Sequence, residues 1–95
     1  MKQFHGKAIY KYQIEVTDEQ TLTLPINAQI LAVQTQWDSP CIWAMIDPKE
    51  KQMEQVTIRI WGTGHPIADS ESLTYLGTFQ MLGGQLVFHV FRKQQ

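Results

Sequence analysis

Apolar and polar residues alternate along several short stretches of the chain, a period of two that is typical of β-strands with one buried face. Within residues 8–16 the two sides are Tyr10, Tyr12, Ile14 and Val16 against Lys11, Gln13 and Glu15. Residues 21–24 alternate again up to Pro25, which has no amide hydrogen to extend a ladder. We therefore predict a hairpin with a short second strand, its turn lying in the polar residues 17–20.

Further strands are predicted at residues 30–35, 41–46, 56–61, 73–82 and 86–91. Residues 56–61 alternate cleanly, so Arg59 and Trp61 share the more polar face with Thr57. Residues 41–46 are apolar throughout, and 86–91 are apolar apart from His89. Such strands lie between two layers or face another subunit. We expect His89 to be a core histidine with one satisfied ring nitrogen.

The connections between these strands carry turn residues. Residues 37–40 and 62–66 are predicted turns or loops, and residues 49–55 are an exposed connection. Residues 68–72 could form a single helical turn capped by Asp69 or Ser70. The pair Gly83 and Gly84 predicts a two-residue hairpin turn, in which both residues take positive φ.

Seven short strands at intervals of about 8–12 residues, with no amphipathic helix, predict an all-β domain. The strands are expected to be mainly antiparallel and to form a small sandwich or barrel; the alternative is a β-rich α+β domain. The 95 residues and 11.0 kDa fit a single domain over residues 1–95. Its core is expected within about residues 8–92.

Charge and cysteine content narrow the possible functions. Eight Lys and Arg against nine Asp and Glu give a net charge of −1, which argues against general nucleic-acid binding. The single Cys41 cannot form an intramolecular disulfide, so a reducing cytoplasm is the expected location. No apolar run reaches the roughly 20 residues of a membrane helix, and no signal peptide is recognised. We expect a soluble protein that does not bind membranes.

The segment Gly62, Thr63, Gly64, His65 is the most informative candidate site, because glycines allow close backbone approach and imidazole can act as acid, base or ligand. Its spacing matches neither phosphate-binding glycine motif. His5, His65 and His89 stand in different elements, so we expect no metal site. No catalytic residue, cofactor or enzymatic activity is predicted.

The aromatic residues support a binding role better than a catalytic one. Trp, Tyr and Arg are enriched at binding hot spots, and Trp61 shares its strand face with Arg59. The predicted partner surface therefore comprises Arg59, Trp61 and the loop that begins at Gly62 and ends at Ile67. The alternative is structural: Trp61 folds over the edge of the core with Arg59 stacked on it.

Short segments distributed over about residues 8–91 carry a resemblance. They are residues 9–12, 30–34, 40–44 and 47–48, GTGHPI at 62–67, YLGTFQ at 75–80, Gly84, and LVFHVF at 86–91. On them the chain resembles a family of small uncharacterised proteins of bacteriophages and bacterial genomes. The resemblance implies a phage or prophage accessory protein acting in the bacterial cytoplasm. It implies no activity, ligand or site residue.

Two functional hypotheses follow. The leading one is a non-enzymatic, homo-oligomeric binding protein that engages a host bacterial protein through the predicted partner surface. The alternative is a protein that binds or sequesters a small ligand or nucleotide at residues 62–65. In that case Arg59 or Lys11 would meet the phosphate, across a subunit interface.

Overall fold

The computed structural model describes residues 6–94, which form seven β-strands and one short 3-10 turn. In chain order the elements are β1 (Ala8–Gln13), β2 (Glu19–Pro25), β3 (Gln29–Gln36), β4 (Ser39–Ile46), β5 (Met53–Gly62), β6 (Leu73–Met81), η1 (Leu82–Gly84) and β7 (Leu86–Lys93). Each predicted strand is present, with ends that differ by a few residues. The prediction of an all-β fold is confirmed.

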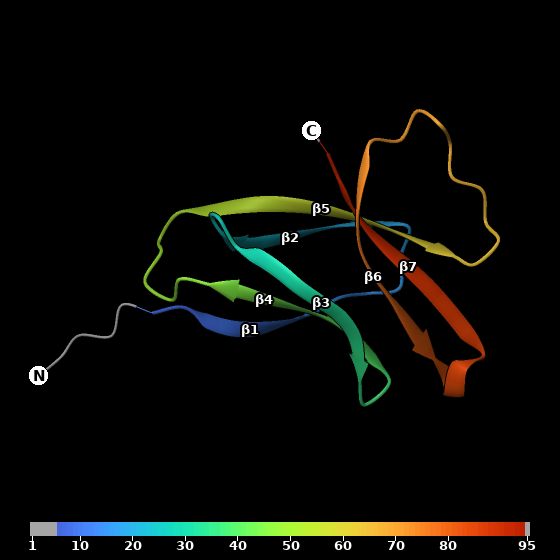
Figure 1. Ribbon diagram of the computed structural model, residues 1–95, viewed down its shortest axis with the longest axis horizontal. Helices are drawn as coiled ribbons and strands as arrows, with labels where there is room; N and C mark the ends of the chain where they lie inside the picture. Colours follow the sequence, from blue (N-terminus) through green and yellow to red (C-terminus); the bar gives the residue numbers. More distant parts are fainter. Residues whose placement is uncertain (1–5, 95) are drawn as a thin grey trace, which may run out of the picture.

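The strands form two antiparallel sheets, one of three strands in the order β1-β4-β3 and one of four in the order β2-β5-β7-β6. The chain passes from one sheet to the other between β1 and β2, between β2 and β3, and between β4 and β5 (Figure 1). The two sheets pack together as a sandwich and do not close into a barrel. In residues 6–94 no helix is long and apolar enough to cross a membrane.

The core lies between the inner faces of the two sheets. It consists of the apolar members of the alternating strands, namely Ile14, Leu24, Val33, Ile42, Val56, Ile58, Ile60, Phe79 and Val90. At one point the sheets approach so closely that a side chain has no room. A Cβ atom on Gly77 would lie 2.9 Å from the Cβ of Val33, next to the bulge between Tyr75 and Gly77. Glycine therefore allows β6 to pack against β3.

The first strand is less buried than its alternation suggests. Ile14 reaches the core and its amide donates to Pro40 O at 3.0 Å, but Tyr10 and Val16 are 47% and 43% exposed. The prediction that all four apolar residues share a buried side is wrong for these two. The reason is topological: β1 is an edge strand and its pairing ends at Gln13.

The predicted hairpin of the first two strands is wrong, because β1 pairs with β4 and β2 pairs with β5 in the other sheet. Three other connections differ in detail from the predictions. The β3–β4 turn consists of Trp37 and Asp38 alone, both at positive φ (53° and 59°). The predicted hairpin at Gly83 and Gly84 is present, and both glycines take positive φ (66° and 93°). Its predicted length of two residues is wrong, because β6 and β7 pair only as far as Met81 and Leu86, which leaves four residues in the connection. Residues 68–72 form no helix. Their turn is a single bond from Glu71 N–H to Ala68 O at 3.1 Å, since no apolar stripe holds a helix there.

Candidate functional site

The outer face of the four-stranded sheet carries the predicted pair Arg59 and Trp61. The pairing registers place Phe91 and then Tyr75 beside Arg59, and His89 and then Thr78 beside Trp61. Directly opposed residues of an antiparallel sheet lie on the same face. The six side chains therefore form two rows across β5, β7 and β6, and we refer to this patch as the aromatic face. It comprises Arg59, Phe91, Tyr75, Trp61, His89 and Thr78.

The rings of the aromatic face pack edge to face. The centroids of Trp61 and Phe91 are 5.7 Å apart at 79°, and those of Phe91 and Tyr75 are 5.4 Å apart at 63°. The guanidinium carbon of Arg59 lies 4.6 Å from the Trp61 ring centroid, within cation–π range. Arg59 thus stacks on Trp61, as in the structural alternative, but the pair lies on the sheet face rather than over the core edge.

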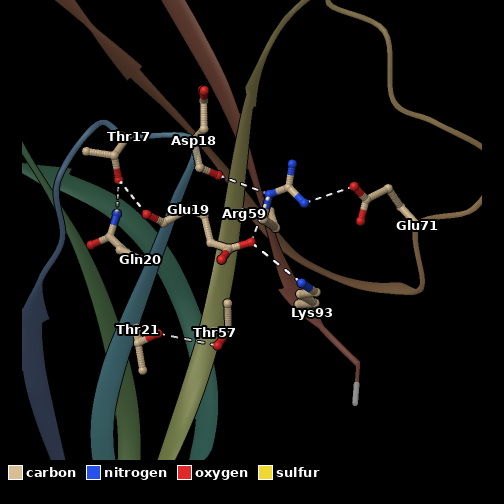
Figure 2. A network of polar contacts seen from close by, with 9 residues as sticks. All are labelled: Thr17, Asp18, Glu19, Gln20, Thr21, Thr57, Arg59, Glu71 and Lys93. Atoms are coloured by element: carbon tan, nitrogen blue, oxygen red, sulfur yellow. Dashed lines mark hydrogen bonds and ion pairs between the residues drawn. The ribbon is translucent and has the colours of Figure 1, made fainter.

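The charge of Arg59 is balanced within the chain (Figure 2). Its Nη1 donates to Glu71 Oε1 at 2.9 Å and its Nε donates to the main-chain oxygen of Asp18 at 3.2 Å. A second carboxylate, Glu19, lies 3.6 Å from Nε and also 3.7 Å from the Lys93 ammonium. Only 20% of the Arg59 side chain is exposed. A phosphate at Arg59 would therefore compete with two carboxylates already in place.

The loop after β5 folds back on itself. Thr63 N–H donates to Val87 O at 3.2 Å, and His65 N–H donates to Gly62 O at 3.1 Å. The His65 ring packs on Gly62, where a Cβ atom would lie 3.2 Å from the ring Cε1, and Gly64 adopts φ +89°. The amides of Thr63 and His65 are thus already used inside the protein, unlike those of a phosphate-binding glycine loop.

His89 is not the core histidine that the sequence predicted. It is half-buried on the outer face, and both ring nitrogens have partners: Nε2 with Thr63 Oγ1 at 2.7 Å and Nδ1 with Thr78 Oγ1 at 3.0 Å. Thr78 Oγ1 also bonds the hydroxyl of Tyr75. Alternation along β7 could have shown this orientation, since buried Val90 precludes an inward His89.

An open cavity of about 420 Å³ borders the loop, with a mostly apolar lining. It is lined by Gly62, Thr63, His65, Gln85, Leu86, Val87 and Phe88. A smaller hollow shares Gly62, His65 and Phe88 with it and is otherwise lined by residues 16–18 and Ile60. His65 therefore borders both hollows. The volume of the larger one suits a protruding side chain or a small molecule.

The structure brings some of the candidates together and separates others. The predicted loop residues Gly62, Thr63 and His65 line the cavity, whereas Arg59 and Trp61 do not line it and belong to the aromatic face on the outer side of the sheet. Lys11 lies in the other sheet, where its Nζ donates to Gln36 Oε1 at 2.7 Å. Residues 85–88 also line the cavity. They were not predicted as site residues, because the sequence does not show that the start of β7 lies against the loop at residues 62–65.

Other candidate features add little to this site. In residues 6–94 no group of three or more His, Cys, Asp or Glu side chains is arranged to hold a metal ion. His5 lies outside the described residues. Trp37, in the predicted turn at residues 37–40, is 91% exposed at the β3–β4 turn.

Comparison with known proteins adds a family. A family profile described as a domain of unknown function, DUF7352, matches residues 5–95. Neither a curated protein nor a solved structure matches the chain significantly.

Proposed function

Because this chain belongs to the DUF7352 family, a domain of unknown function, we propose its function from its geometry: a non-enzymatic, homo-oligomeric binding protein that engages a host protein. The setting that we propose is the bacterial or phage-infected cytoplasm, where it would act as a phage or prophage accessory protein.

The open cavity beside the loop is the observation that supports this proposal most strongly. Its wall combines His65 with Leu86 and Phe88, and Leu86 is 42% exposed. Large apolar side chains around a concave surface are typical of sites that accept an anchoring residue of a partner protein. The aromatic face is a separate surface on the outer side of the same sheet, where Tyr75 is 57% exposed.

The alternative, a nucleotide site, has less support within one chain. Among the residues that line the cavity none is Lys or Arg. The Arg59 guanidinium is held by Glu71, and Lys11 belongs to the other sheet. A phosphate would therefore meet neither a free cation nor the amides of Thr63 and His65.

The test introduces a charge into the apolar cavity. Leu86→Asp is matched by Leu31→Asp, since Leu31 has nearly the same exposure, 43% against 42%, and lies on β3 in the other sheet. Proteins captured from bacterial lysate by the wild type are identified, purified and titrated against each variant by calorimetry. We expect Leu86→Asp and His65→Ala to weaken binding at least about tenfold, equivalent to about 1.4 kcal/mol, and Leu31→Asp to leave it unchanged.

A partner that binds Leu86→Asp as tightly as the wild type would contradict the proposal. Thermal stability measured with ATP, GTP and cyclic dinucleotides tests the alternative. A nucleotide that raises the melting temperature of the wild type but not of His65→Ala would favour the nucleotide site, since a ligand of the folded state stabilises it by mass action.

A further inference from the structure

Strand β1 is an edge strand that no other part of residues 6–94 covers. The opposite edge of its sheet, β3, packs against β6 at Val33 and Gly77. The β2 edge carries Glu19 and ends in Pro25, two features that discourage pairing with another strand. Strand β1, with the sequence AIYKYQ, contains no proline or acidic residue and exposes 60% of Ile9 and 47% of Tyr10.

The hydrogen-bonding groups on this edge can be assigned from the ladder. Ile14 N–H donates to Pro40 O, so the main-chain N–H and C=O groups of Ile14 point toward β4. Because these groups alternate along a strand, those of Tyr12, Tyr10 and Ala8 also point toward β4. The N–H and C=O groups of Ile9 and Lys11 therefore point away from the sheet. An additional strand could bond to them directly.

Lys11 is a charged residue on this edge strand, but its side chain does not block pairing with another strand. Its ammonium donates to Gln36 Oε1 on β3 at 2.7 Å and lies 6.0 Å from the Trp43 ring centroid on β4. The side chain thus reaches over its own sheet, away from the side on which another strand would add. A charged residue on an edge strand normally discourages pairing, but here it leaves the neighbouring position open.

We propose that β1 pairs antiparallel with β1 of a second copy, about a two-fold axis at Tyr10, so that two three-stranded sheets become one sheet of six. This inference rests on the self-association in the proposed function, and it uses a different sheet from the cavity. Ile9 then lies opposite Lys11 of the second copy, and these two residues exchange the outward-pointing hydrogen bonds.

Charge selects this register over its neighbours. The pairing must keep the outward-pointing residues opposite one another, so the next registers differ by two residues. One of them places Lys11 opposite Lys11 of the second copy, and the other places Lys7 opposite Lys11. Like charges directly opposite each other destabilise a sheet. With Tyr10 on the axis, no lysine opposes a lysine.

The first test removes one outward amide from each edge. Lys11→Pro takes away an N–H that β4 does not use. Thr23→Pro is the matched control on β2. Asp18 O accepts from Ile60 N–H, so the main-chain groups of the even-numbered residues of β2 point toward β5. The N–H of Thr23 therefore points outward, and a proline there also removes an amide that the sheet does not use. By sedimentation velocity we expect the wild type and Thr23→Pro to be dimers, and Lys11→Pro to be a monomer or to dissociate at least tenfold more readily, with an unchanged circular dichroism spectrum.

The second test fixes the register and does not depend on a proline. A residue on the axis at a non-hydrogen-bonded position has its Cα about 4.5 Å from its counterpart, within disulfide range. Tyr10→Cys should therefore form a covalent dimer on mild oxidation, and Gln13→Cys should not. The native Cys41 is 2% exposed and does not compete.

The outcomes separate the two proposals. A wild-type dimer that Lys11→Pro leaves intact, or Gln13→Cys crosslinking as readily as Tyr10→Cys, overturns the β1 interface while self-association stands. A wild type that stays monomeric at high concentration overturns both. Binding of a host protein is judged independently by Leu86→Asp, in the other sheet.

Discussion

The outer faces of the two sheets are built in different ways. On the outer face of the four-stranded sheet the polar side chains are bonded to one another. Arg59 is paired with Glu71, and both ring nitrogens of His89 have hydrogen-bond partners. On the three-stranded sheet, Ile9 is paired with Met45 and Lys11 with Trp43, and Trp43 Nε1 is buried without a hydrogen-bond partner among the described residues. The face of the four-stranded sheet satisfies its own polar groups. The face of the three-stranded sheet presents an apolar strip, formed by Ile9, Met45 and Trp43, beside the β1 edge.

This difference indicates which surface is available for which kind of contact. An antiparallel sheet can leave one face to solvent when that face is polar or satisfied. The Arg59 network also holds the exposed connection before β6, since Glu71 is tied to β5 and through it to the main chain of Asp18 (Figure 2). In the described part of the chain the three-stranded sheet has no such network of ion pairs, and its β1 edge is where a second copy would add.

The largest expected effect comes from the contact between the two sheets at Gly77 of β6 and Val33 of β3. Gly77→Ala would place a Cβ atom 2.9 Å from Val33 Cβ and force β3 and β6 apart. We expect the free energy of unfolding to fall by about 1–3 kcal/mol, as for other overpacked cores, measured by urea denaturation. The exposed Gln80→Ala on the same strand should change it by less than about 0.5 kcal/mol. Equal stability of the two variants would show that the sheets are not joined at Gly77.

The second prediction contrasts the cations of the two faces. Arg59→Ala leaves Glu71 without its partner and removes the stacking on Trp61, so it should cost about 1–2 kcal/mol at low salt. Lys11→Ala, on the other sheet, should cost less than about 0.5 kcal/mol because its contacts are exposed. High salt should reduce the Arg59 effect. Equal costs would mean that the Arg59 network adds nothing to stability.

The sequence predicted which residues share a sheet face wherever a strand alternates without interruption. In β5 the period of two placed Arg59 and Trp61 on one face, and the structure agrees. Alternation along β7 carried the same information for His89, but its apolar neighbours suggested a core position. Strict alternation along a strand therefore predicts correctly to which face of the sheet each of these side chains points.

What the sequence could not show depends on how distant segments meet. The cavity needs residues 62–65 of one connection and residues 85–88 beside another, and no local pattern links them. The bulge beside Gly77 and the edge position of β1 likewise follow from sheet order. For that reason the exposure of Tyr10 and Val16 was missed, although their alternation is clear.

The third prediction compares one tryptophan from each face. Trp61→Phe weakens the stacking with Arg59, for which indole is the best partner, and should cost about 1 kcal/mol. Trp43→Phe removes a buried N–H that has no acceptor among the described residues, so the change should stay within about 0.5 kcal/mol. Both are measured by chemical denaturation. A larger loss for Trp43→Phe would show that its indole N–H is bonded in solution.

The smallest expected effect concerns Tyr12, on the inner side of β1. Burial raises the pKa of Tyr12 above its ordinary value of 10.0, and the charge of the neighbouring Tyr10 raises it further. Because the folded pKa is the higher one, the neutral phenol contributes stability that is fully present below pH 10.0 and is lost as pH rises through the folded pKa. In Tyr12→Phe the free energy of unfolding should fall less steeply above pH 10.0, with Tyr75→Phe as the control.

The titration of Tyr12 also tests whether a second copy pairs with the β1 edge of the three-stranded sheet. In the proposed dimer Tyr12 lies opposite Ala8 of the second copy, which covers the phenol further and favours its neutral form. The tyrosinate absorbance of the wild type should therefore rise at higher pH as protein concentration increases, and that of Lys11→Pro should not. If both proteins titrate identically at every concentration, the second copy does not lie beside Tyr12. The apolar strip of the three-stranded sheet then faces solvent with its edge unpaired.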